Sequence, residues 1–301
     1  MSQRHALLTG ATGFVGSHLC RHLLAQQWRV TVLVRPGSDT GDLQALSPDV
    51  AIAVYDENAD DLAAIMAKAS PDIVFHLASL FLAEHSAEQV GPLIDSNVRF
   101  GARLLEAMSA AQVRCLINTG TFWQHYHGDA YRPVNLYAAT KQAFEAILAY
   151  YTDMRGITAL TLKLSDTYGP QDKRNKLISL LQKMAREGGE LKMSPGEQQI
   201  DIVHIDDAAR AFIMAAERCL RLPAGTQESY AVSSGQPLAL RDLVGVFEDA
   251  AATRLDIEWG ARPYREREVM HTWQGGTPVP GWQPQITLRD GFAELVRTSQ
   301  P

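Results

Sequence analysis

The chain has 301 residues, of which 46% are hydrophobic and 21% charged, and its formal net charge at pH 7 is −6. This length suffices for one large or two smaller domains with a sizeable core. The acidic balance and the lack of a basic run argue against nucleic acid and anionic membranes as partners.

In the first half of the chain, short apolar runs alternate with stretches whose apolar residues recur at helical spacing. The runs predict strands at 6–8, 29–34, 50–54, 73–77, 114–118 and 159–164. The stretches between them predict helices at 14–26, 60–68, 95–110 and 137–155. This alternation predicts an α/β fold with a Rossmann-type, doubly wound parallel sheet. In such a sheet, ligands bind at the carboxyl ends of the strands.

After residue 164 the alternation loosens. Helices are expected at 177–186 and 206–217, and residues 254–286 hold four prolines and three tryptophans. We predict a first domain at 1–165 and a smaller, mainly substrate-binding domain at 166–301. The chain is expected to cross back to the first domain near 200–235.

Three glycines stand where the first strand passes into the first helix. One allows a tight bend, another lets backbone N–H groups approach a pyrophosphate, and the third lets helix and strand pack closely. The N-terminus of a helix also attracts phosphate charge. The turn therefore predicts that the first domain binds a dinucleotide, through Gly10, Thr12, Gly13, Phe14, Val15 and Gly16.

The residue after the second strand is decisive for the choice between NAD and NADP. An acidic side chain there would bind the ribose 2′-OH and repel a 2′-phosphate. This chain has Arg35, whose guanidinium matches a phosphate. We therefore predict NADP(H) rather than NAD, although Asp39 and Asp42 stand close enough in sequence to offer the alternative.

A second motif lies in the helix predicted at 137–155. Tyr137 and Lys141 are four residues apart, so they share one helix face and can reach a common ligand. A positioned phenol can donate a proton to a ligand, and Tyr137 is the candidate for this role. A nearby ammonium favours a phenolate, so Lys141 is expected to lower the pKa of Tyr137.

Together, the glycine turn and the Tyr-x-x-x-Lys motif resemble those of the extended short-chain dehydrogenases/reductases, in their nucleoside-diphosphate-sugar epimerase and reductase branch. The resemblance covers nearly the whole chain and implies an NAD(P)-dependent oxidoreductase. It also implies that Lys141 holds the nicotinamide ribose. Further cofactor contacts that it implies are Leu77, Ala78, Ser79 and Leu164.

The resemblance implies a third catalytic group, a hydroxyl at the end of the fifth strand. Counting along that strand assigns it to Thr121, with Thr119 as the alternative. The dehydratases of this family resemble Thr-Asp-Glu at this point. This chain has Phe122 and Trp123 in place of the acid pair, which argues against a dehydratase.

Residues 121–124, 135–145 and 166–170 resemble one subgroup, the CDP-abequose/CDP-paratose synthases. This implies NADPH-dependent reduction of the 4-keto group of a nucleotide-linked, CDP-bound 6-deoxy- or 3,6-dideoxyhexulose, for deoxysugar and O-antigen biosynthesis. Many relatives carry a diphosphate-binding Arg where this chain has Ile200, so we expect the anion to meet arginines elsewhere. The expected substrate contacts are Trp123, Gln124, Asp166, Arg265 and Arg267.

Other interpretations remain open at this stage. They are an NAD-dependent sugar-nucleotide 4-epimerase, a non-catalytic NADP-binding regulator, and a reductase of small non-nucleotide ketones. We expect a cytoplasmic protein, since the N-terminus does not resemble a signal peptide. We expect no metal, because the three cysteines lack ligand spacing. A homodimer through the helices at 95–110 and 137–155 is usual for the family.

Overall fold

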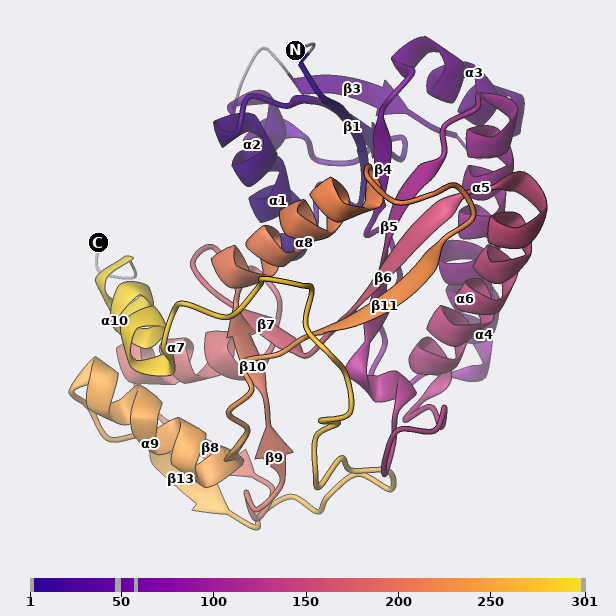
Figure 1. The fold of residues 1–301 in the computed structure, drawn as a ribbon. Coiled ribbons are helices and arrows are strands. Elements are labelled where there is room, and N and C mark those ends of the chain that lie inside the picture. Colours follow the sequence, from indigo (N-terminus) through magenta and orange to yellow (C-terminus); the bar gives the residue numbers. More distant parts are fainter. Residues whose placement is uncertain (1–2, 47–49, 57–58, 299–301) are drawn as a thin grey trace.

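A seven-stranded parallel sheet runs through the larger part of the molecule (Figure 1). The structure is a computed structural model, and it describes residues 3–46, 50–56 and 59–298. The order of the sheet is β11-β6-β5-β4-β1-β2-β3. The strands are β1 (His5–Thr9), β2 (Arg29–Val34), β3 (Val50–Val54), β4 (Ile73–His76), β5 (Cys115–Thr121), β6 (Thr158–Leu164) and β11 (Gln227–Val232). The predicted Rossmann-type fold is confirmed. The chain moves outward in opposite directions from β1 and β4, so the crevice for a ligand opens between them.

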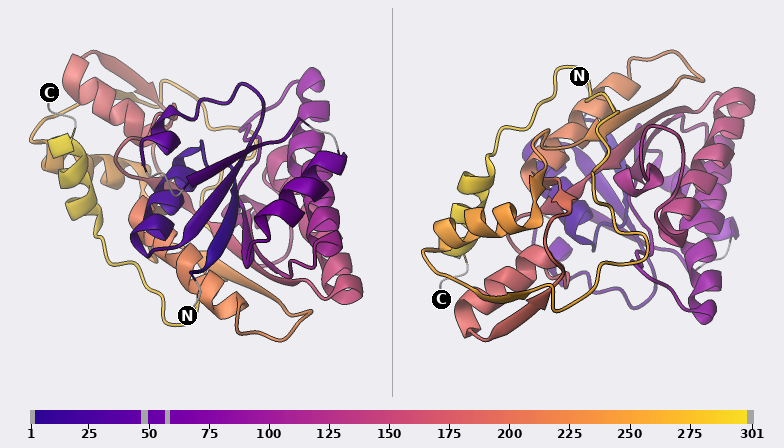
Figure 2. Two further views of the ribbon diagram at one scale, coloured as in Figure 1. Left: turned by 90° about the horizontal axis from the view of Figure 1, so that it is seen from above. Right: turned by 90° about the horizontal axis from the view of Figure 1, so that it is seen from below.

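Helices cover both faces of this sheet, as Figures 1 and 2 show. In β1, Ala6 and Leu8 belong to the core on one face, whereas Leu7 belongs to the core on the other. Successive side chains of a strand alternate between faces, which explains why the strands are continuous apolar runs. The first face is covered by α1 (Phe14–Ala25) and α8 (Ile205–Cys219), and the second by α3 (Ala59–Ala69), α5 (Phe100–Ala110) and α6 (Leu136–Arg155).

A separate hydrophobic core lies below the sheet in the view of Figure 1. Its helices and one strand pair are α7 (Leu177–Glu187), α9 (Leu240–Ala251), α10 (Leu288–Thr298), β8 (Glu190–Met193) and β13 (Asp256–Trp259). Two more short pairs are β7 (Asp166–Tyr168) with β10 (Ile202–His204), and β9 (Gln199–Ile200) with β12 (Leu238–Ala239). Among the described residues, no helix is both long and apolar enough to cross a membrane.

Several elements differ from the sequence-based expectations. The helix expected at 95–110 starts with a π-helical turn at Asp95–Arg99, which continues α4 (Val90–Ile94). The fifth strand runs on to Thr121 and is followed by a single 3₁₀ turn at Phe122–Gln124. Neither β11 nor the helices α9 and α10 were expected. The first half of β11 is largely polar and partly exposed at the sheet edge, so it lacks the apolar run that marks the other strands. The remaining short helices are α2 (Gly41–Gln44) and a 3₁₀ turn at Ala87–Gln89.

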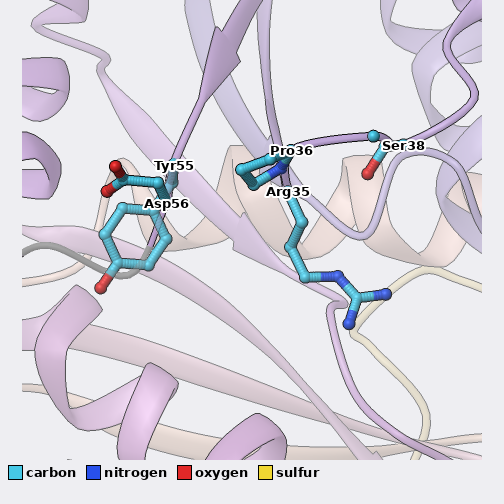
Figure 3. Close-up of a pocket in the computed structure, with 6 residues that line it drawn as sticks. Arg35, Pro36, Ser38, Tyr55 and Asp56 are labelled. Carbon is cyan, nitrogen blue, oxygen red and sulfur yellow. The ribbon is translucent and has the colours of Figure 1, made fainter.

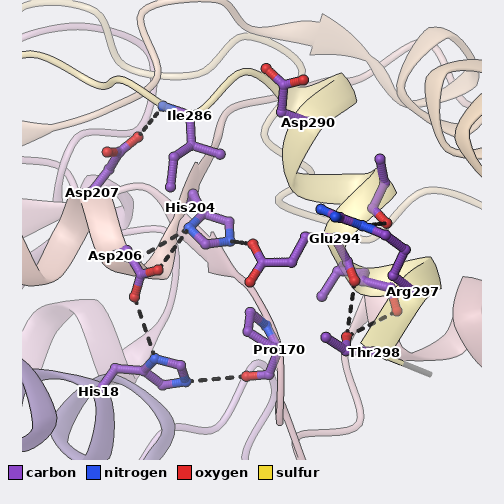
Figure 4. A network of polar contacts seen from close by, with 12 residues as sticks. His18, Pro170, His204, Asp206, Asp207, Ile286, Asp290, Glu294, Arg297 and Thr298 are labelled. Carbon is purple, nitrogen blue, oxygen red and sulfur yellow. Dashed lines mark hydrogen bonds and ion pairs between the residues drawn. The ribbon is translucent and has the colours of Figure 1, made fainter. Parts of the chain in front are cut away.

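A polar network ties the two cores together (Figure 4). Asp206, at the start of α8, lies 3.7 Å from Nδ1 of His18 in α1, and hydrogen bonds from α1 histidines hold the pKa of this carboxyl well below its usual range. The other ring nitrogen of His18 lies 3.1 Å from the Pro170 carbonyl. The buried His204 lies 3.3 Å from Glu294 of α10. These contacts fix α10 and the turn after β7 against the helix that follows the glycine turn.

Candidate active site

The glycine turn between β1 and α1 is shaped by close backbone contacts. The N–H of Gly13 donates to the Gly10 carbonyl at 3.0 Å, and Gly10 has a φ of +74°. A Cβ atom at Gly10 would lie 2.6 Å from the Ala78 nitrogen, and one at Gly16 would lie 2.1 Å from the Gly10 carbonyl oxygen. No side chain caps the N-terminus of α1, and its first turn carries no acidic residue. Free helix N–H groups beside a turn without side chains fit a dinucleotide pyrophosphate.

The end of β4 lies directly against this turn. The hydroxyl of Thr9 accepts hydrogen bonds from the N–H groups of Leu77 (3.2 Å) and Ala78 (3.1 Å). It lies 3.0 Å from Nδ1 of His76, to which it donates, because both of its lone pairs are engaged. Burial lowers the pKa of His76 to about 3, so the ring is neutral. The expected cofactor contacts Leu77 and Ala78 therefore adjoin the glycine turn, and His76 lies in the core beside them.

Arg35 lines a hollow of about 370 Å³ (Figure 3). The lining residues are Arg35, Pro36, Gly37, Ser38, Tyr55 and Asp56. The two acidic residues that offered an alternative are engaged elsewhere: Asp39 accepts from the Gly41 N–H at 3.0 Å, and Asp42 pairs with Lys173 at 2.9 Å. Among the described lining residues, the Arg35 guanidinium is the cationic group and the Asp56 carboxyl is the acidic one.

The other residues expected around the cofactor occupy the rim of the turn and the carboxyl edge of the sheet. Thr12 is exposed, whereas Val15 is half-buried against the core. The ring of Phe14 lies 4.2 Å from the Arg174 guanidinium carbon. Leu164 ends β6 and is the register partner of Thr121, so two predicted residues 43 positions apart stand side by side.

Tyr137 and Lys141 lie in the first two turns of α6, which begins where Asn135 accepts a hydrogen bond from the Ala138 N–H at 2.9 Å. Both are buried, with exposed fractions of 9% and 3%. Burial raises the pKa of Tyr137 to about 12, against a hydrogen bond with Ser79 that lowers it. Burial also lowers the pKa of Lys141 to about 8. The expectation that Lys141 lowers the pKa of Tyr137 is wrong for this structure, because the cost of burying a phenolate dominates.

The two candidate hydroxyls at the end of β5 have different surroundings. The Thr121 hydroxyl accepts from the Trp123 N–H at 3.3 Å and thereby caps the 3₁₀ turn. Accepting this bond leaves its own proton free to donate. The Thr119 hydroxyl is buried, and it has no hydrogen-bond partner within the described part of the chain.

Gln124, expected among the substrate contacts, instead binds other residues of the chain in this structure. Its side chain is 0% exposed. The amide nitrogen donates to Gln142 (2.7 Å) and Glu145 (2.8 Å) of α6, and its oxygen accepts from the Thr121 N–H at 2.9 Å. Gln124 therefore fixes the end of β5 against α6 and positions Thr121. The neighbouring Trp123 is only half-buried.

Phe81 also lies beside Tyr137, although the sequence did not indicate it as a site residue. Its ring lies edge-on to that of Tyr137, with centroids 5.0 Å apart, and 5.5 Å from that of Trp123. Asp166, expected at the substrate, forms an ion pair of 2.7 Å with Lys176. The position of Phe81 shortly after a strand end, where ligands bind in such sheets, was the signal that could have found it.

The two arginines expected at the diphosphate lie in the irregular segment between β13 and α10, and both are exposed. The Arg267 guanidinium carbon lies 4.5 Å from the ring centroid of Tyr126, in the loop after β5. The Arg265 N–H donates to Glu268 at 3.3 Å. Ile200 pairs with Leu238 in a short antiparallel ladder.

Comparison with known proteins identifies the family. Residues 6–231 match the family described as the NAD dependent epimerase/dehydratase family. The chain belongs to this family. The resemblance to extended short-chain dehydrogenases/reductases is thereby confirmed, as is the expectation of an oxidoreductase-type enzyme.

Two curated relatives extend over nearly the full length. CDP-abequose synthase of Salmonella typhimurium is 24% identical and covers 98% of each chain. UDP-glucose 4-epimerase of Mycolicibacterium smegmatis is 29% identical and covers 96% of each. Among solved structures, a UDP-glucose-4-epimerase from Stenotrophomonas maltophila with bound NAD has a TM-score of 0.86, 19% identity and 98% coverage of each chain. This likeness supports the fold.

Proposed function

We propose that the protein reduces the 4-keto group of a CDP-linked 6-deoxy- or 3,6-dideoxyhexulose with NADPH. The observation that carries the proposal is the hollow beside Arg35, because a cationic guanidinium after β2 suits the 2′-phosphate of a cofactor that is consumed as a reductant. The full-length relative named CDP-abequose synthase supports the substrate class.

In this proposal, the residues around Tyr137 handle the proton and the carbonyl. The raised pKa keeps Tyr137 protonated, so it can give its proton to the C4 oxygen as the alcohol forms. Thr121 has a hydroxyl proton left to donate to the same oxygen. Lys141, buried one turn along α6, holds the nicotinamide ribose. When bound, NADPH supplies the hydride.

The substrate diphosphate is proposed to meet Arg265 and Arg267. Support comes from the contact of Arg267 with Tyr126, which brings this arginine to the loop that follows the strand of Thr121. We also propose a homodimer through α5 and α6. Tyr150 and Met154 are large exposed side chains on α6, 53% and 65% exposed, and such groups favour an interface.

The test is NADPH oxidation, followed at 340 nm, with a CDP-linked 4-keto-3,6-dideoxyhexose. One NADPH should be consumed per sugar reduced, and NADH should serve at least tenfold less well. The second candidate is a 4-epimerase, which the relative named UDP-glucose 4-epimerase favours. Interconversion of UDP-glucose and UDP-galactose without net oxidation of cofactor, together with no NADPH consumption, would replace our proposal by this one.

A further inference from the structure

Phe81 stands on a segment that is held rigidly beside the proposed proton donor. Asn97, 1% exposed, accepts from the Leu80 N–H at 2.7 Å and donates to the Leu80 carbonyl at 3.0 Å. On the other side of Phe81, the Asn135 amide donates to the carbonyls of residues 82 and 83, at 3.2 and 2.9 Å. Four hydrogen bonds to backbone groups on both sides therefore fix where the Phe81 ring is presented.

The ring is nevertheless exposed. Phe81 is 42% accessible, although its edge contacts both Tyr137 (centroids 5.0 Å apart) and Trp123 (5.5 Å). Because Trp123 is also only half-buried, the two rings form an exposed apolar surface that a ligand can cover. Because Tyr137 adjoins it, whatever covers this surface lies next to the reacting carbonyl.

Charged groups border the same surface. The Lys176 ammonium lies 5.1 Å from the centroid of the Phe81 ring and 2.7 Å from the Asp166 carboxylate. The two charges of this ion pair neutralise each other. The Phe81 and Trp123 rings beside the pair form an apolar wall with a polar rim. The faces of these two rings offer no hydrogen-bond acceptor to a hydroxyl group pressed against them.

We propose that Phe81 and Trp123 determine specificity by contacting the C6 methyl group of the hexulose, which selects 6-deoxy sugars over 6-hydroxy sugars. This inference rests on the proposed function, which sets C4 beside Tyr137. The C6 methyl projects from C5, the ring neighbour of C4, so it can reach rings adjoining Tyr137. A methyl group gains from burial against aromatic rings, whereas a hydroxyl there loses its water without a replacement.

The experiment compares binding of CDP-6-deoxyglucose and CDP-glucose by calorimetry to enzyme saturated with NADPH, which cannot react with either alcohol. We expect the wild type to bind CDP-6-deoxyglucose about 10- to 100-fold more tightly, the range a hydrophobic pocket achieves against an added hydroxyl. Phe81→Ser should reduce this ratio to within about threefold of unity, and Phe81→Leu should keep most of it.

Ile94→Ser is the matched control, since Ile94 in α4 is a large apolar residue with the same exposed fraction as Phe81, 42%. It should leave the ratio unchanged, and all variants should keep the NADPH affinity of the wild type. An unchanged ratio in Phe81→Ser, or no preference in the wild type, overturns the role of the wall while leaving the reductase proposal intact. Failure of the wild type to bind either sugar nucleotide overturns both.

Discussion

The glycine turn between β1 and α1 keeps its shape through backbone contacts, whereas the surface around Tyr137 is assembled from side chains of separate segments. At the turn, a single added carbon at Gly16 would lie 2.1 Å from a carbonyl oxygen. Around Tyr137, by contrast, Phe81, Trp123 and Lys176 come from three loops or helix starts and touch through their rings and charges. Changes in the first region should therefore act by steric exclusion, and changes in the second by altered chemistry in an intact fold.

The largest effect is expected in the second region, for Tyr137→Phe. Loss of the proton donor should lower kcat by on the order of 10²–10⁴ while NADPH binding holds. Tyr168→Phe is the matched control, because the buried Tyr168 hydroxyl has no hydrogen-bond partner in the described chain. It should retain kcat within a few fold. Steady-state NADPH oxidation measures both, and comparable kcat values for the two variants would remove Tyr137 from the mechanism.

In the first region, Gly16→Ala should force α1 away from the turn. Overpacking of this kind costs about 1–3 kcal/mol of stability, and the distorted turn should lower NADPH affinity at least about tenfold. Gly245→Ala in α9, where a Cβ meets nothing within 4 Å, should instead stabilise by about 0.5–1 kcal/mol. Urea unfolding and NADPH titration provide the readouts. Normal NADPH binding by Gly16→Ala would show that the turn is not the pyrophosphate site.

Arg35→Asp tests the cofactor site by changing its charge, whereas Gly16→Ala changes its shape. Loss of a charge-assisted hydrogen bond to the 2′-phosphate should cost about 1.5–3 kcal/mol of NADPH affinity and leave NADH binding equal or better. Arg35→Lys keeps the charge without the planar fork, so it should fall between wild type and Arg35→Asp. If the wild type uses NADH and NADPH equally well, the assignment of Arg35 is wrong.

His76, buried between the two regions, makes stability depend on pH. Its pKa of about 3 in the folded state lies below the 6.5 of a free imidazole. Below pH 6.5 the His76 ring therefore binds a proton in the unfolded chain but not in the folded chain. The free energy of unfolding consequently falls as the pH drops. Between pH 8 and pH 5 the loss from this group is about 2 kcal/mol. His76→Asn should lose that part of the pH dependence in unfolding measurements, whereas the exposed His85→Asn should keep it.

The smallest effect is expected where substrate charge meets exposed side chains. Arg265→Ala or Arg267→Ala should raise the KM for the sugar nucleotide about tenfold, with NADPH affinity unchanged. We expect one strong and one mild phenotype, with Arg265 as the stronger. Arg267 contacts Tyr126. If this contact is purely structural, Arg267→Ala should lower the stability of the protein and leave the KM unchanged. Normal KM values in both variants would place the diphosphate elsewhere.

The sequence by itself determined the parts of the site that depend on neighbours along the chain. The glycines at 10 and 16 indicate the passage from strand to helix, because a Cβ atom there would lie 2.6 and 2.1 Å from other backbone atoms. The spacing of Tyr137 and Lys141 puts both on one face of a helix whatever the rest of the chain does. The parallel sheet followed from the same kind of local evidence, the alternation of apolar runs and helical stretches.

Only the tertiary structure decided the burial and the hydrogen-bond partners of those residues. Burial sets the pKa of Tyr137, and burial depends on strands and loops distant in sequence. Gln124 looked like a residue facing the substrate, yet α6 supplies the two acceptors that turn its amide inward. Phe81 carries no motif, and its place beside Tyr137 exists because Asn97 and Asn135 hold its segment there. Contacts between residues far apart in the chain leave no periodic trace in the sequence, so these positions follow only from the folded structure.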